Sequence, residues 1–84
     1  MTNAEMLAGV KSALGIGGNY QDNTITQYID EVMDFLKGAG VDTATVKPGL
    51  VARGVSDLWN YGSGNGKLSE YFMQKAAQMS IKGA

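Results

Sequence analysis

Residues 23–37, NTITQYIDEVMDFLK, carry the clearest structural pattern in the chain. Apolar side chains recur there at three- and four-residue spacing, which places them on one face of an α-helix. These side chains belong to Ile25, Tyr28, Ile29, Val32 and Leu36, with Met33 and Phe35 widening the face. Asp30, Glu31 and Asp34 fall outside it. The stretch therefore predicts an amphipathic helix that packs on a core and carries acids on its outer side.

Short-range signals mark the ends of this helix. Asp22 or Asn23 is expected to cap its first turn, because either side chain can accept a hydrogen bond from a free backbone N–H. Lys37 suits the negative end of the helix dipole, and Gly38 is expected to end the helix. The preceding stretch, GIGGNYQDN from position 15, is rich in glycine and asparagine and predicts a loop.

A helix over residues 3–14 is predicted before that loop. Thr2 and Glu5 have the spacing of a capping box, in which each side chain accepts a hydrogen bond from the other residue's backbone N–H. Gly15 stands where a left-handed cap is expected, and Ile16 can pack back on the last turn. The apolar positions of this helix are Met6, Leu7, Val10, Ala13 and Leu14.

A further helix is predicted over residues 48–61, after a connection at 39–46 with too few β-branched residues to build a sheet. Pro48 fits its first turn, and Gly62 is expected to end it. Gly54 interrupts the pattern at a cost of about 1 kcal/mol relative to alanine, which predicts that another helix approaches closely there. The apolar ridges of this helix consist of Leu50, Val51, Val55, Leu58 and Trp59.

The last helix is predicted within LSEYFMQKAAQMSI, residues 68–81, beginning at Leu68 or Ser69 with Ser69 as its cap. One apolar stripe is formed by Leu68, Phe72, Ala76 and Met79, and Tyr71, Met73 and Ala77 add apolar surface beside it. The sequence thus predicts an all-α fold, a small bundle of about four helices joined by glycine-rich loops, as a single domain over 1–84. A domain this small is not expected to cover all of this apolar surface.

The composition excludes several kinds of chemistry. The chain has 84 residues with no cysteine and no histidine, so it forms no disulfide and lacks the commonest general base and the commonest transition-metal ligands. DNTITQ, from Asp22, lacks the alternating oxygen ligands and central glycine of a calcium loop. We expect no cofactor and no metal. No apolar run approaches the roughly 18 residues of a membrane span and no secretory signal is visible, so a soluble intracellular protein is expected.

Charge is unevenly distributed along the chain. The net charge is −1, but residues 1–42 hold two lysines and six acids, whereas residues 43–84 hold five basic residues and two acids. One interpretation is that these are simply solvated faces. The other is that an acidic surface on one copy faces a basic surface on the next, as a head-to-tail ring of identical subunits requires.

The glycine-rich stretch GSGNGKLS, residues 62–69, resembles a phosphate-binding loop only superficially. A Walker A motif requires glycine where Tyr61 stands and serine or threonine where Leu68 stands. A dinucleotide fingerprint fails because its third glycine position is Lys67. The stretch is therefore predicted to be a flexible loop between two helices, and no nucleotide-dependent enzyme is expected.

Two other functional hypotheses are weak. A helix-turn-helix DNA reader needs Arg, Lys, Asn or Gln toward the groove, and the third helix offers only Arg53 and Asn60 beside Asp57. Asp30 and Asp34 are one turn apart, as a catalytic carboxylate pair requires, but so are many solvated acids on helix surfaces. We therefore favour neither a DNA-binding protein nor an enzyme with a catalytic carboxylate pair.

The chain resembles the small head–tail connector proteins of tailed bacteriophages, also called adaptor or DNA-packaging proteins. The resemblance rests on three stretches in order, which together cover most of the chain: VKSALGI (10–16), DNTITQYIDEVMDFLKGAGV (22–41) and GVSDLWNYGSGNGKLSEYFMQKAAQMS (54–80). It implies a helical, non-enzymatic adaptor that forms a ring of about a dozen copies on the portal after DNA packaging. Such a ring extends the DNA channel and docks the tail or the next connector.

This resemblance implies a location and a set of partners. The protein would lie at the head–tail junction of the virion, and in the host cytoplasm during assembly. It would contact the portal protein, neighbouring connector or tail proteins and further copies of itself, and DNA would pass through without sequence-specific recognition. Residues expected at subunit or portal contacts are Trp59, Tyr61, Tyr71, Phe72, Arg53, Lys67, Asp30 and Asp34.

Some alternatives stay open at this point. The spacing of Trp59 and Phe72 fits the core of the monomer as well as an interface. For the whole chain, the runner-up interpretation is a small helical protein-binding module of prophage origin, and a DNA-binding regulator comes third.

Overall fold

The computed structural model describes residues 2–59 and 66–83 of the chain. Over these residues the protein forms four α-helices, one turn of 3-10 helix and no strand, so the prediction of an all-α fold is confirmed. The elements are α1 (Asn3–Leu14), α2 (Asp22–Gly38), η1 (Thr43–Thr45), α3 (Pro48–Leu58) and α4 (Glu70–Gly83).

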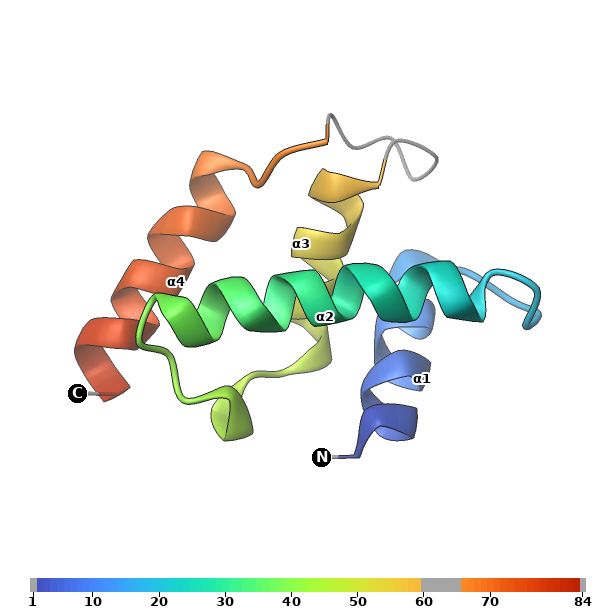
Figure 1. The fold of residues 1–84 in the computed structure, drawn as a ribbon, viewed down its shortest axis with the longest axis horizontal. Helices are drawn as coiled ribbons and strands as arrows, with labels where there is room; N and C mark the ends of the chain where they lie inside the picture. Colours follow the sequence, from blue (N-terminus) through green and yellow to red (C-terminus); the bar gives the residue numbers. More distant parts are fainter. Residues whose placement is uncertain (1, 60–65, 84) are drawn as a thin grey trace.

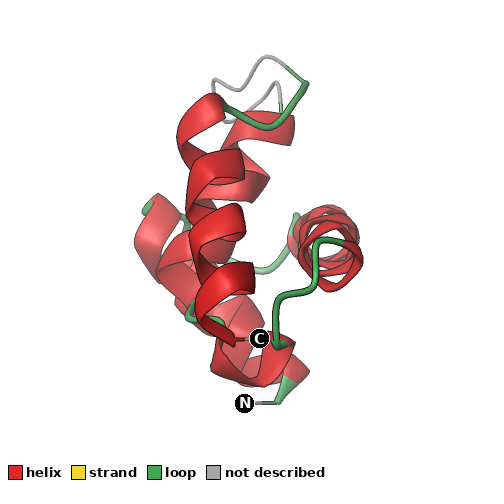
Figure 2. Ribbon diagram, turned by 90° about the vertical axis from the view of Figure 1, so that its left-hand side faces the viewer, coloured by secondary structure: helices red, strands yellow, loops and turns green. Residues whose placement is uncertain are grey.

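The helix α3 is the centre of the arrangement. Both α1 and α2 pack against it more extensively than they pack against each other, and α4 also contacts it. Figure 1 shows α2 crossing in front of α3, with α1 and α4 toward opposite ends of α2. In Figure 2 α2 is seen end-on, to one side of the other three helices. One side of α2 therefore faces the bundle, and the opposite side faces outward.

The core forms where the apolar faces of the helices meet. Val10, Ile25, Val32, Leu36, Val51, Val55 and Phe72 are fully buried. The sequence predicted this face of α2, and Asp30, Glu31 and Asp34 are exposed on its other side, as expected. At Gly54 a Cβ atom would lie 2.8 Å from Val32 Cγ2 and 2.9 Å from Phe72 Cε2. The predicted close approach at this glycine is therefore confirmed, and it involves both α2 and α4.

The helix α1 begins and ends as its sequence predicts. The Thr2 N–H donates to Glu5 Oε1 at 2.9 Å, and the Glu5 N–H donates to Thr2 Oγ1 at 3.1 Å, which completes a capping box. The backbone N–H of Thr2 and then its hydroxyl hold the pKa of the Glu5 carboxyl below its ordinary value. Gly15 adopts the left-handed conformation at φ 73°, and the Ile16 N–H donates to the carbonyl of Lys11 at 2.9 Å.

The ends of α2 differ from the prediction. Its N-cap is Gln21, which makes no side-chain capping bond, so the expected cap by Asp22 or Asn23 is wrong. Asp22 instead lies in the first turn, where its carboxylate pairs with Lys11 Nζ at 2.7 Å. At the other end Gly38 is still helical, and Gly40, at φ 87°, is the glycine that takes the left-handed conformation.

The helix α3 is shorter than predicted. It ends at Leu58 rather than at residue 61, because Trp59 has an extended backbone, with φ −95° and ψ 105°. The expected stop at Gly62 lies outside the described residues. The helix α4 begins at Glu70, and Ser69 caps it by accepting a hydrogen bond from the Phe72 N–H at 3.2 Å, as predicted.

Asp57 of α3 ties down the segment that enters α4. Its backbone carbonyl accepts a hydrogen bond from the Gly66 N–H at 3.0 Å, and its carboxylate accepts one from the Ser69 N–H at 3.1 Å. The glycine-rich stretch, predicted as a flexible interhelical loop, lies outside the described residues up to position 65. Its described part is therefore attached to the end of α3.

Candidate functional site

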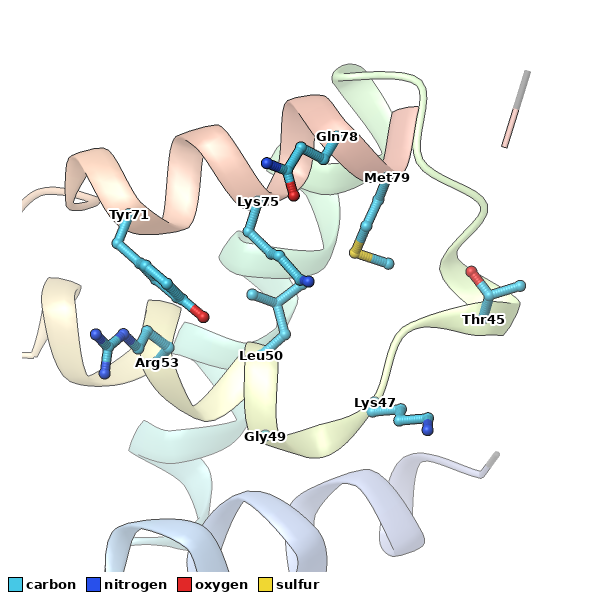
Figure 3. Close-up of a pocket in the computed structure, with 9 residues that line it drawn as sticks. All are labelled: Thr45, Lys47, Gly49, Leu50, Arg53, Tyr71, Lys75, Gln78 and Met79. Carbon is cyan, nitrogen blue, oxygen red and sulfur yellow. The ribbon is translucent and has the colours of Figure 1, made fainter. Parts of the chain in front are cut away.

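A groove of about 930 Å³ lies on the described surface, and Figure 3 shows it in close-up. It lies between η1, the N-terminal half of α3 and the side of α4. Arg53 and Tyr71 lie at one end, and Thr45 and Lys47 lie at the other. The charged and large apolar side chains that line the groove belong to Lys47, Leu50, Arg53, Tyr71, Lys75 and Met79.

Helix geometry explains why these side chains come together. Leu50 and Arg53 are three residues apart and share the face of α3 that is turned away from the buried Val51 and Val55. Tyr71, Lys75 and Met79 recur every four residues along α4, so they form one row on its surface. The buried Phe72 and Ala76 hold α4 against the core and place this row beside α3.

Arg53 and Tyr71 join the two helices at one end of the groove. The guanidinium carbon of Arg53 lies 4.4 Å from the centre of the Tyr71 ring, which is a cation–π contact. Such contacts at exposed sites contribute about 0.5–1 kcal/mol. The contact connects α3 and α4 at the surface, where Tyr71 stays 56% exposed.

The groove combines positive charge with apolar surface. Among the nine described residues that line it, three are cations, Lys47, Arg53 and Lys75, and none is an acid. Leu50 and Met79, both half-buried, lie between the cations. A surface of this kind suits carboxylates that are carried on a helix or segment with apolar atoms beside them.

A second charged surface has the opposite sign. Asp30, Glu31 and Asp34 are exposed on α2, on the side opposite the fully buried Val32 and Leu36. The helix α2 lies to one side of the other helices (Figure 2) and packs on α3 through Val32 at Gly54. Helix periodicity therefore directs its acidic side away from the bundle. We call this surface, formed by the three carboxylates, the acidic face of α2.

Two residues predicted at an interface belong to the core instead. Trp59 is 6% exposed and its ring stacks on Tyr28, with centroids 6.1 Å apart. Phe72 is fully buried and its ring lies 5.8 Å from that of Phe35. The alternative that sequence analysis left open, that both are monomer core, is therefore the one the structure supports.

The other predicted residues are distributed over several places. Arg53 and Tyr71 meet in the groove, and Asp30 and Asp34 lie on the acidic face of α2. Lys67 is exposed ahead of α4, outside the groove lining. Tyr61 lies outside the described residues.

Sequence reasoning missed Lys47, Leu50, Lys75 and Met79 as parts of one site. The only signal for the lysines was the excess of positive charge in residues 43–84. Leu50 and Met79 had been placed on apolar stripes, without any indication that those two stripes adjoin. The periodicity of each helix shows which residues share a face, but it does not show which faces are neighbours.

The described residues also bear on two other kinds of site. They contain no group of three or more His, Cys, Asp or Glu placed to hold a metal ion. Within the same residues, no helix combines the length and apolar character needed to cross a bilayer.

Comparison of the chain with protein-family models, with curated proteins and with solved structures found no match. The functional argument therefore rests on the residues, on the two charged surfaces and on the resemblance in sequence described above.

Proposed function

We propose that this protein is a structural subunit of a phage head–tail connector. In this role it assembles as a ring on the portal, extends the DNA channel, and docks the tail or the next connector after packaging. The observation that carries the proposal is the presence of two surfaces of opposite charge on one small helical domain: the basic groove and the acidic face of α2.

Two different complementary surfaces on one chain favour head-to-tail assembly. A contact between unlike surfaces leaves one of each free on every complex, so further copies can add. Such a series closes into a ring when a whole number of copies completes a full turn without a shift along the axis. Otherwise it forms a filament. A portal would act as a template that selects the closed ring.

Exposed apolar side chains on α4 also support an assembly role. Tyr71 and Met73 are 56% and 50% exposed, and they flank the buried Phe72 on opposite sides of this helix. Tyrosine and methionine are enriched at protein interfaces relative to the rest of the surface. We assign this part of α4 to contacts with other connector, portal or tail proteins.

The proposed role requires no catalysis and no cofactor. DNA would pass through the ring without being read, and a chain of net charge −1 does not hold phosphates tightly. Tight electrostatic binding would slow the passage of DNA. The virion location is part of the same proposal.

Co-sedimentation of the purified protein with its cognate portal tests this function. We expect the protein to sediment with the portal and not with duplex DNA of the same mass. A DNA-binding regulator would instead bind duplex DNA, with an affinity that falls steeply as salt increases. A helical binding module unrelated to connectors would sediment with neither, and this result would contradict the proposal.

A further inference from the structure

We propose that the basic groove of one copy binds the acidic face of α2 of the next copy. The inference rests on the proposed function, because it assumes that the protein assembles with itself, and it specifies the contact that does so. The groove is the receiving surface and α2 is the inserted element.

The charges of the two surfaces match in number. The groove carries Lys47, Arg53 and Lys75, and the acidic face of α2 carries three carboxylates. Asp30 and Asp34 are one helical turn apart, a rise of about 6 Å, and Glu31 lies beside them. The three cations come from different elements and are distributed along the groove, so a helix laid across it can reach more than one of them (Figure 3).

Apolar contacts are available at the same place. Leu50 and Met79 lie between the cations of the groove. On α2 the half-buried Met33 is three residues from Asp30 and borders the acidic face. The methylene groups of Glu31 add further apolar atoms, as long charged side chains commonly do. The incoming helix therefore offers both carboxylates and some apolar surface.

The contact cannot form within one chain. The opposite side of α2 packs on its own α3, where Val32 lies against Gly54, so the acidic face is directed away from the bundle. The groove is lined by η1, α3 and α4 of the same chain. A second copy must therefore supply the acidic helix, and the resulting interface is of the head-to-tail kind.

A nucleic acid fits the groove less well. Phosphates do not require the apolar surface that Leu50 and Met79 provide, and the acidic face of α2 would repel a long polyanion. Binding of DNA to the groove is instead one of the outcomes that the experiment distinguishes.

Charge reversal on each surface tests the contact. The groove variant is Lys47→Glu with Lys75→Glu, which leaves the Arg53–Tyr71 contact in place. The helix variant is Asp30→Lys with Asp34→Lys. Each variant alone should associate with itself at least about tenfold more weakly than the wild type, because like charges then face each other. An equimolar mixture of the two should recover association, since reversed surfaces pair with each other and unreversed surfaces do likewise.

Three controls make the result interpretable. Glu70→Lys changes the charge of an exposed residue outside the groove and should leave association unchanged. Circular dichroism and thermal unfolding of each variant check that it is folded. Sedimentation is measured both for the protein alone and with portal present, because assembly on the portal is part of the proposed function.

Cross-linking provides a test that reports which surfaces meet and does not require charge reversal. The chain has no cysteine, so Asp34→Cys and Lys75→Cys can be made in separately tagged copies and oxidised after mixing. We expect a mixed dimer to form more readily than either homodimer. Predominant Asp34→Cys homodimers would mean that α2 meets α2, and this would overturn the inference.

The outcomes separate the inference from the proposed function. If the charge variants form rings on the portal as well as the wild type does, the groove contact is refuted and the connector function stands. If the groove variant instead loses affinity for duplex DNA, the groove binds nucleic acid and the inference fails. If the wild type neither associates with itself nor binds the portal, both proposals fail together.

Discussion

Replacing Gly54 with alanine tests the close packing of three helices, because side chains of α2 and α4 both approach α3 at this residue. The new Cβ atom would lie 2.8 Å from Val32 Cγ2, 2.9 Å from Phe72 Cε2 and 3.0 Å from Val32 Cγ1. Distances under 3.0 Å force neighbouring atoms to move, and here the neighbours are fully buried side chains of α2 and α4. The substitution is thus expected to push these helices away from α3.

Two effects of opposite sign determine the size of the change. Overpacking of a well-filled core typically costs about 1–3 kcal/mol. Alanine in a helix interior is more favourable than glycine by about 1 kcal/mol. Since the contacts at Gly54 are with two helices at once, we expect an overpacking cost of about 2–3 kcal/mol and a net loss of stability of about 1–2 kcal/mol. In a domain of this size that lowers Tm by about 5–15 °C.

Gly49→Ala provides a matched control on the same helix. A Cβ atom at Gly49 would meet nothing within 4 Å, so only the backbone effect remains. This variant should be as stable as the wild type or up to about 1 kcal/mol more stable. Urea and thermal unfolding, followed by circular dichroism, measure both variants. The packing argument is refuted if Gly54→Ala is as stable as Gly49→Ala.

Four further substitutions probe other parts of the fold, each by urea unfolding. Thr2→Ala removes the side-chain cap of α1 and should lower the free energy of unfolding by about 1 kcal/mol, and an unchanged urea midpoint would count against this cap. The stabilisation that accompanies the lowered Glu5 pKa is present at neutral pH and is lost as the pH falls through that pKa. Part of it should persist in Thr2→Ala, because the backbone N–H of residue 2 remains. Phe72→Ala should cost about 3–5 kcal/mol, whereas Tyr71→Ala should cost about 1 kcal/mol or less, and equal costs would contradict the assignment of only Phe72 to the core. Lys11→Met removes the ion pair with Asp22 and the hydrogen bond to the Gly18 carbonyl, and should lower the free energy of unfolding by about 1–2 kcal/mol. An unchanged urea midpoint would show that these two contacts do not stabilise the loop before α2.

Helix content was predictable because the signals are local. The capping box at Thr2, the left-handed Gly15 and the four-residue spacing in α2 each act within a few positions of the chain. The close approach at Gly54 also followed from the sequence. A glycine in the interior of a helix lowers helix stability, and close packing against another helix can offset this loss. Its partners, Val32 and Phe72, could not be inferred, since they depend on how three helices are arranged.

The helix ends that were mispredicted depend on tertiary contacts. Asp22 has the right chemistry for a cap, but its carboxylate is bound to Lys11 eleven residues earlier. Trp59 leaves the helical conformation after Leu58, and its ring stacks on Tyr28 of another helix. In both cases the residue contacts a partner far away in the sequence, Lys11 for Asp22 and Tyr28 for Trp59, and does not take the conformation or role that its neighbours in the sequence favour.

The candidate site was only partly predictable for the same reason. Arg53 and Tyr71 were identified as interface residues, and they meet in the groove. Trp59 and Phe72 were proposed on the same grounds, but an aromatic residue on an apolar stripe has the same spacing whether it faces the core or a partner. The groove itself depends on the packing of α4 beside α3. The periodicity of one helix does not show which other helix lies next to it.

The central claim is that copies of this protein assemble as a connector ring on a portal. The most direct test is the mass of the protein measured alone and after mixing with its cognate portal. We predict a portal complex that carries a closed ring of about a dozen copies, and a ring that weakens at high salt if charge holds it together. A protein that remains strictly monomeric and leaves the mass of the portal unchanged would contradict the account.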